Sequence, residues 1–376
     1  MSTTQEHQAV STLLVCVAMM ILLLGAAHSV FCQGQWSDPF EVRLGPAPVL
    51  IQPDAALFFH PPPPRQGGLS VDTQNRSAVV DFFDTYYTPA LSVPISWTGS
   101  IAGCVAGVTS QDYIDATLQM VNYYRAMTEL PGDVGNVISL NDDSQEAALM
   151  MIAEPGLSHT PDPEWACYTS AGAAAAFKSN LALGNAGPSA VVAYVRDGGA
   201  GNYDVGHRRW ILYPPQAGMA TGSNDAVNTY HGANDLYVFA SFGARPAAPS
   251  VVAWPPPAYV PYQLIYDRWS MSLNSAPSAS YASATVTMTL DGSNVPLTVV
   301  SRTAGYGDTT IVWEPSGLSF GAGQPDQTVT VTVDGISGSP LVSYDVIVID
   351  PALTPDTIFE DGFESGNTNA WSDVTP

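Results

Sequence analysis

The spacing of apolar residues changes part-way along this chain. Between residues 109 and 197 they recur every three or four positions, and Ile114, Leu118 and Val121 fall on one face of a helix. Between residues 251 and 350 they alternate with threonines instead, as in SATVTMTLDG and QTVTVTVDG. The first spacing is typical of helices on a core and the second of strands with one buried face. We therefore predict a mixed α/β fold followed by a small all-β sandwich.

Four helices and two buried strands are predicted in the first segment. The first helix begins at a capping box formed by Thr109 and Asp112, and the second ends at Pro155. SAGAAAAFKSNLAL reads as a small-residue helix or turn, and PSAVVAYVRDGG as a helix that ends before Gly198. WILYP and NDLYVFASF are predicted to be strands, so helices and strands share one layered structure over residues 104–245.

The N-terminal 29 residues have the pattern of a secretory signal peptide. The run from Val10 to Ala27 is almost wholly apolar, and Ala27 and Ser29 occupy the small-residue positions of a cleavage site. The preceding MSTTQEHQ has no Lys or Arg, so an uncleaved membrane anchor stays open as the alternative. Either way, we expect the rest of the chain to be secreted or in the cell envelope, outside the cytoplasm.

Two segments show no hydrophobic period of their own. Residues 30–103 are rich in Pro, with PPPP at 61–64, and are predicted to be an extended leader. Residues 351–376 are predicted to be an acidic tail, and their DGFESG resembles the tails of many exported gammaproteobacterial proteins. The predicted domains between them are residues 104–245 and residues 251–350.

The balance of charge excludes one class of partner. The chain has 34 acids against 11 Lys and Arg, a formal charge of -23. Such a surface repels nucleic acid and acidic lipid. We therefore expect no nucleic-acid partner, and membrane association only through an uncleaved N-terminal segment.

Two of the four cysteines are predicted to form a disulfide bond. Cys16 lies in the signal segment and Cys32 follows the cleavage point, which leaves Cys104 and Cys167 in the folded region. In an exported protein, such a pair is typical of a disulfide rather than of a metal site.

The remaining candidates for chemistry are two histidines, an acid and a pair of arginines. His159 follows the second helix, His207 precedes a predicted strand, and Asp197 ends the helix before it, so the three could converge. In a strand, Arg208 and Arg209 would face opposite ways, one neutralising Asp197, Asp204 or a helix C-terminus and the other facing solvent. For these arginines, and for Arg125 in the first helix, structural pairing is preferred over substrate binding.

The order of six short motifs resembles the CAP superfamily, which groups cysteine-rich secretory proteins, insect venom antigen 5 and plant pathogenesis-related proteins. The match is best to its bacterial SCP-domain branch, and the motifs are VNYYRAM, SQEAALMM, LSHTP, SNL, AYVRD and GHRRWILYP. The resemblance implies a CAP-type α-β-α sandwich, here followed by an immunoglobulin-like sandwich. It also implies a cavity lined by two histidines and two acids, which can hold a divalent metal.

The cavity residues carry over with one departure from the family pattern. His159 and His207 match the two histidines, Asp197 matches one acid, and Ser179 stands where the second acid is expected. Two imidazoles, a carboxylate and a water suit zinc, although the missing acid would weaken its binding. The alternative is that Asp197 only caps a helix or pairs with Arg208, while the histidines only form hydrogen bonds.

The resemblance implies a secreted protein that binds an extracellular ligand or protein without catalysis. An extracellular hydrolase that uses His159, Asp197 and His207 is the first alternative. A cell-surface adhesion protein, in which the CAP domain is a scaffold for the β-sandwich, is the second alternative. Histidine nitrogens within coordination reach of each other would favour the binding protein or the hydrolase, and histidines that point apart would favour the adhesion protein.

Overall fold

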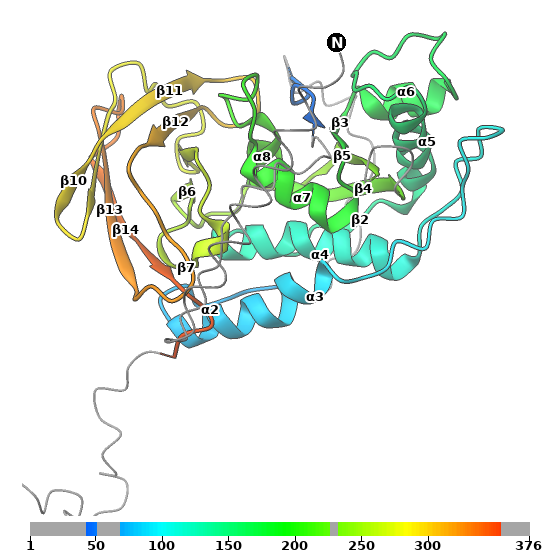
Figure 1. Ribbon diagram of the computed structural model, residues 1–376. Helices are drawn as coiled ribbons and strands as arrows, with labels where there is room; N and C mark the ends of the chain where they lie inside the picture. The colour runs from blue at the N-terminus through cyan, green and yellow to red at the C-terminus, as the bar shows by residue number, and fades with distance from the viewer. Residues whose placement is uncertain (1–42, 51–67, 226–231, 355–376) are drawn as a thin grey trace, which may run out of the picture. The chain divides into compact units, whose positions relative to one another are not determined.

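Three β-sheets organise the computed structural model, which describes residues 43–50, 68–225 and 232–354 (Figure 1). One sheet carries helices and precedes residue 246, and the other two lie between residues 251 and 349. The predicted mixture of helices and strands is therefore confirmed. The predicted signal peptide, Cys16, Cys32, His231 and most of the predicted tail lie outside the described residues.

The described residues up to Arg245 form what we call the α/β part. Its helices are α2 (Arg76–Phe82), η2 (Phe83–Tyr87), α3 (Thr88–Ala90), α4 (Gln111–Met127), η3 (Ile138–Leu140), α5 (Asn141–Ala153), α6 (Ser170–Ala176), α7 (Gly187–Arg196) and α8 (Gly206–Ile211). Its strands are β1 (Arg43–Leu44), β2 (Gly135–Asn136), β3 (Ser179–Leu183), β4 (Gln216–Asn224) and β5 (Ala233–Phe242), in the sheet order β1-β3-β5-β4-β2.

Helix α4 carries the predicted apolar face, and Leu118 and Val121 are buried on it. The prediction of its start was wrong by one residue. Ser110 rather than Thr109 is the N-cap, and its hydroxyl accepts a hydrogen bond from the backbone nitrogen of Tyr113. Two neighbouring residues that can both cap are hard to distinguish in a sequence, because the choice depends on how the preceding loop approaches the helix.

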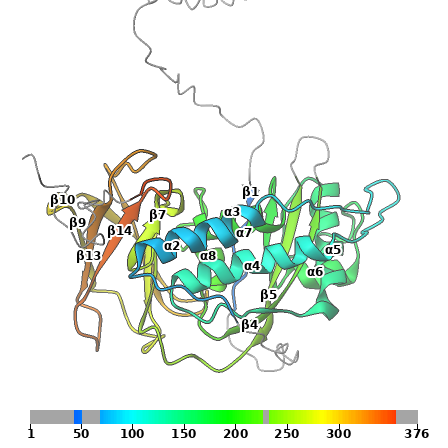
Figure 2. The same cartoon turned by 90° about the horizontal axis from the view of Figure 1, so that it is seen from below.

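Part of the predicted extended leader is helical and packs on α4. Helices α2 and α3 run beside α4 in both views of the chain (Figure 2). Phe82 stacks on Tyr123 with ring centroids 4.9 Å apart, and Tyr87 lies 5.3 Å from the same ring. The aromatic residues that suggested an irregular leader are thus core residues, and their partners are remote in sequence.

Both faces of the sheet in the α/β part are covered. Every residue of β3 and β4 is buried, and consecutive strand residues point to opposite faces. Helices α5 and α6 pack on the sheet, as do α4 and α7. The predicted strand NDLYVFASF is confirmed as β5, whereas SNLAL, predicted to be helix or turn, is strand β3.

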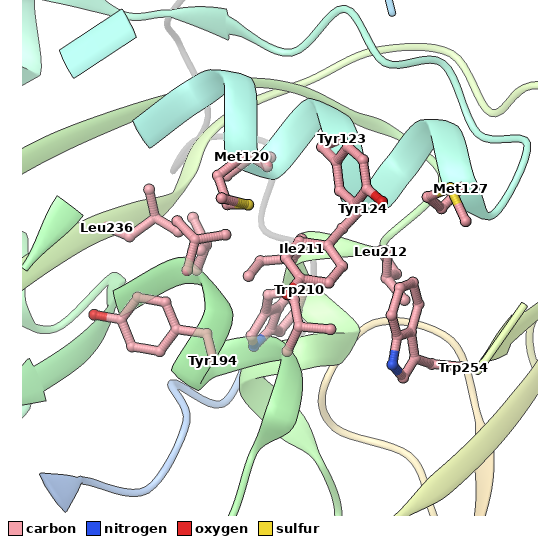
Figure 3. Packing of buried hydrophobic residues seen from close by; sticks show 14 of the residues in the cluster. Met120, Tyr123, Tyr124, Met127, Tyr194, Trp210, Ile211, Leu212, Leu236 and Trp254 are labelled. Carbon is pink, nitrogen blue, oxygen red and sulfur yellow. The ribbon is translucent and has the colours of Figure 1, made fainter. Parts of the chain in front are cut away.

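The segment WILYP was predicted to be a strand, but its first two residues, Trp210 and Ile211, end helix α8. Its apolar run is too short for periodicity to tell a buried strand from a buried helix. The helix directs Trp210, Ile211 and Leu212 into the core beside Tyr124 of α4 (Figure 3). The three residues are all buried, so they do not alternate between two faces as they would on the predicted strand.

Residues 251–349 form two packed sheets, which we call the β part. Its strands are β6 (Val251–Trp254), β7 (Ala258–Pro261), β8 (Trp269–Leu273), β9 (Thr285–Leu290), β10 (Ser293–Val295), β11 (Leu297–Thr303), β12 (Thr310–Pro315), β13 (Gln327–Asp334) and β14 (Val342–Ile349). The sheet orders are β10-β9-β13-β14-β7 and β11-β12-β8-β6. All pairs are antiparallel except β14 with β7. The predicted alternation is confirmed, since Val329, Val331 and Val333 are fully buried.

Arg208 and Arg209 fasten the α/β part to the β part. Arg208 donates to the carbonyls of Val195 (2.6 Å) and Arg196 (3.2 Å), which end α7, and to the carbonyl of Arg268 (2.9 Å). Its fourth acceptor is the Ser270 hydroxyl, at 3.0 Å. Burial lowers the pKa of Arg208 to about 10, although the nearby Asp197 opposes this shift.

Arg209 binds a different segment of the β part, from the end of β11 to Asp308. It donates to the carbonyls of Thr303 (3.0 Å) and Asp308 (2.7 Å), and its guanidinium lies 5.2 Å from the Tyr306 ring. The prediction that one of the two arginines faces solvent was wrong, because both are buried. Their acceptors are backbone carbonyls and hydroxyls. The predicted helix C-terminus is among them, since Arg208 binds the last carbonyls of α7, whereas no carboxylate is among the described acceptors.

The prediction that Arg125 has a structural role is confirmed. Its guanidinium joins α4 to the segment after α8 by hydrogen bonds to the carbonyls of Pro131, Ile211 and Tyr213, each 2.9 Å long. The described residues all belong to one compact unit, Phe40–Pro376. Within the described ranges, no helix combines the length and the apolar composition that a membrane span requires.

Candidate functional site

Asp197 and His207 form a wholly buried pair at the junction of α7 and α8. The ring Nδ1 of His207 lies 2.8 Å from Oδ1 of Asp197, and both side chains are fully inaccessible to solvent. Oδ2 of Asp197 accepts from the backbone nitrogens of His207 (2.9 Å) and Arg208 (3.2 Å). The same carboxylate thus orients the imidazole and satisfies the first free N–H groups of α8.

The local backbone explains why this acid reaches α8. Asp197 follows the last residue of α7 in a left-handed conformation, with φ 51° and ψ 47°. A left-handed residue reverses the chain direction at a helix end and is usually Gly, as was predicted for Gly198. An Asp is tolerated there because its short side chain can bond locally, here to the helix that follows.

A polar network surrounds the imidazole of His207. Its ring stacks on Tyr194 with centroids 5.6 Å apart, and the Tyr194 hydroxyl donates to the side-chain oxygen of Asn234 at 2.9 Å. Asn180 donates to the carbonyl of His207 at 3.1 Å. The Nε2 atom of His207 is buried and has no hydrogen-bond partner within the described structure. An imidazole held at Nδ1 with Nε2 unengaged has the arrangement of a general base.

His159 does not join this pair. Its Nδ1 lies 2.6 Å from the carbonyl oxygen of Ala176 and its Nε2 lies 2.6 Å from that of Pro46. Both ring nitrogens therefore face backbone carbonyls, which leaves neither of them directed at a metal site shared with His207.

Ser179 lies on the opposite face of the sheet from the His207 network. Neighbouring Asn180 bonds to His207, and consecutive residues of strand β3 point to opposite faces. The Ser179 hydroxyl instead contacts Oδ1 of Asp235 at 2.8 Å and the carbonyl of Ala175 at 2.8 Å. The position predicted for a missing metal-binding acid therefore faces away from the two residues it was expected to join.

Asp235 is an ionisable group that the sequence analysis missed. It is fully buried on β5, and burial raises its pKa to about 8, although the hydrogen bond from Ser179 opposes the shift. A protonated carboxyl fits the contacts, since the single Ser179 proton cannot serve Asp235 and Ala175 at once. An acid inside the apolar run NDLYVF was the signal that could have identified it.

The structure brings together two of the three predicted cavity residues. Asp197 and His207 are in contact, whereas His159 is bound to two backbone carbonyls. Across residues 43–50, 68–225 and 232–354, no group of three His, Cys, Asp or Glu side chains is placed to hold a metal ion. The predicted disulfide is confirmed, with a distance of 5.0 Å between the Cα atoms of Cys104 and Cys167.

Comparison with family models and with curated proteins assigns no role to these residues. No family model matches the chain. A search of curated proteins also found no match. The case for function therefore rests on the geometry of this molecule.

The α/β part also has an open hollow of about 700 Å³ along α7. Its walls include Arg196 at the end of α7, Arg43 of β1, and Asp267 of the β part. Leu91, which is 42% exposed, contributes apolar surface, and Gly198 borders it beyond α7. A volume of this size suits a small organic ligand. None of the predicted cavity residues lines it, so the sequence analysis missed this site.

Proposed function

We propose that this protein acts outside the cytoplasm as a non-catalytic binding protein built on a CAP-like scaffold. In this proposal, residues 104–245 form the CAP-type α-β-α sandwich and residues 251–350 an immunoglobulin-like sandwich. The coverage of both sheet faces and the two packed sheets of the β part support this assignment. The Cys104–Cys167 disulfide supports an oxidising environment outside the cytoplasm.

The observation that carries the proposal is the open hollow along α7, and the structural use of both histidines weighs against a catalytic or metal site. His159 is engaged by two carbonyls, and His207 lies with Asp197 in a fully buried network. The arrangement does not favour a metal cavity. Because the two histidines do not share a site, it favours a scaffold role for the CAP-like domain. The hollow along α7 gives the same domain a place to bind a ligand without histidines, which favours ligand binding over adhesion through the β part alone.

A hydrolase is the second candidate, and one observation favours it. Asp197 holds Nδ1 of His207 while Nε2 has no partner within the described residues, as in a general base. The 0% exposure of both side chains weighs against this candidate, since a substrate must reach the base.

A substrate screen separates the two candidates. The exported chain would be assayed against ester, peptide and phosphate-ester substrates, with and without zinc, beside His207→Gln and the surface control Asp291→Asn. Binding without catalysis predicts no turnover that depends on His207. Turnover that Asp291→Asn keeps and His207→Gln loses, with the fold intact by circular dichroism, would establish the hydrolase. A parallel thermal-shift screen of small molecules would identify ligands of the binding protein.

A further inference from the structure

Most of the Lys and Arg side chains that the structure describes contact other residues of the chain. Arg125, Arg208 and Arg209 bind backbone carbonyls, as described above. The remaining contacts join Arg76 to Asp326, Arg245 to Asp308, Arg268 to Glu314, Arg302 to the Ala284 carbonyl, and Lys178 to the Tyr237 ring. The exposed Arg196 guanidinium makes no hydrogen bond or ion pair with another residue that the structure describes.

Arg196 is also the cation that lines the hollow from the end of α7. Arg43 adds a second positive charge to the lining, and Asp267 adds one negative charge. The lining is therefore net positive in a molecule whose formal charge is -23. The positive lining attracts anions, whereas the acidic surface around it repels them. Anions are therefore favoured at the hollow over the rest of the surface.

The remaining walls show what kind of anion fits. Leu91 and Val192 supply apolar surface, and Asn185 and Ser189 supply neutral hydrogen-bonding groups. The hollow is open next to Gly198, since a Cβ built on this residue would meet no atom within 4 Å. A hydrocarbon body with one anionic end would satisfy both kinds of wall.

We propose that the hollow binds a small organic carboxylate, whose charged end pairs with Arg196 and whose hydrocarbon body packs toward Leu91. Guanidinium and carboxylate match in geometry and form two parallel hydrogen bonds. The carboxylate provides a partner that Arg196 does not have among the described residues. This inference names the ligand class of the proposed binding function and rests on it.

Calorimetric titration of the exported chain tests the inference with a matched pair of probes. The acid is 3-phenylpropionate, and the control of the same size without charge is 3-phenylpropionamide. We expect the acid to bind at least about tenfold more tightly than the amide, because only the acid forms a charge-assisted pair. Added sodium chloride should weaken the acid and leave the amide unchanged.

Two variants locate the site, and a third is the control. Arg196→Gln removes the charge, and Gly198→Phe adds a ring to the lining of the hollow without changing charge. Both should weaken binding of the acid by roughly tenfold or more. Arg302→Gln removes a cation from β11 and should bind the acid as wild type does.

Several results would overturn the inference. They are equal affinity for acid and amide, wild-type affinity in Arg196→Gln or Gly198→Phe, and no binding of benzoate, hexanoate or 3-phenylpropionate up to about 10 mM. If carboxylates fail to bind and no His207-dependent turnover is found, this inference fails while the proposed non-catalytic role stands. If such turnover is found, the proposed function fails independently of the titration.

Discussion

The carboxylate of Asp197 contacts His207 twice, at the ring Nδ1 (2.8 Å) and at the backbone nitrogen (2.9 Å). The pair is fully buried, and it links the left-handed turn after α7 to the first turn of α8. Arg268 of the β part donates to the Asp197 carbonyl at 3.0 Å, so the two parts of the chain meet at this residue. The pair therefore holds local structure as well as a candidate base.

Asp197→Ala should lower the free energy of unfolding by about 3 kcal/mol or more, because it leaves buried donors on His207 and Arg208 without an acceptor. Asp197→Asn should cost roughly 1–2 kcal/mol, since Asn tolerates the left-handed backbone and keeps one acceptor oxygen. Urea unfolding would measure both. Asp291→Ala is the control, because Asp291 is exposed and also has a positive φ, 46°. Equal losses in Asp197→Ala and Asp291→Ala would mean that only backbone strain is at stake.

Asp235 should make stability fall as pH rises from about 4 to about 8. Its pKa is raised from 3.8 to about 8 in the folded protein, so within that range the folded state holds a proton that the unfolded state has released. The proton favours folding below pH 4 and its contribution is lost as pH approaches 8, by up to about 1 kcal/mol per pH unit.

The variant Asp235→Asn should remove this slope and be more stable than wild type at pH 8, since an amide of the same shape needs no proton. Denaturant unfolding at a series of pH values would measure the difference. Asp345→Asn on the exposed face of β14 serves as the control and should keep the wild-type slope. An unchanged slope in Asp235→Asn would show that Asp235 is already ionised at neutral pH.

Zinc titration tests the metal hypothesis directly. We expect no heat of binding for wild type, because both nitrogens of His159 are engaged and Ser179 faces away from His207. Ser179→Glu would strengthen zinc binding under the metal hypothesis. Here it should lower the free energy of unfolding by several kcal/mol, because a second buried carboxyl is placed beside Asp235. Saturable zinc binding that His207→Ala abolishes would restore the metal site.

Arg208→Met should destabilise both parts of the chain together. The variant removes a guanidinium that binds the end of α7 and the Arg268–Ser270 segment, so we expect a loss of about 3 kcal/mol or more. Helical circular dichroism and tryptophan fluorescence should report one shared transition, shifted to lower urea. Arg302→Met, with a single described hydrogen bond, should shift little. Two separate transitions in wild type would show that the parts unfold independently.

Removing the disulfide should cost about 4 kcal/mol, the chain-entropy estimate for closing the 63-residue separation of Cys104 and Cys167. The double variant Cys104→Ser with Cys167→Ser and the reduced wild type should unfold at the same urea concentration. The double variant should not respond to reducing agent, which serves as the internal control. A wild-type protein that is equally stable with and without reductant would contradict the estimate.

Local pattern was sufficient to determine much of the fold. Alternation of valine and threonine determined β9 and β13, because a strand with one buried face requires a period of two. The three-to-four spacing around Leu118 and Val121 determined α4 for the same kind of reason. The two cysteines left in the folded region were enough to predict their disulfide.

Tertiary structure decided what local pattern leaves ambiguous. GHRRWI became a helix because Asp197 satisfies its first N–H groups and the β part supplies acceptors for both arginines, and neither partner is visible in the segment itself. The candidate site was decided in the same way. Strand geometry turned Ser179 away from His207, carbonyls from two distant segments engaged His159, and the fold placed Arg196 in the lining of a hollow. The sequence shows which donors and charges the chain carries, but their partners are brought to them only by folding.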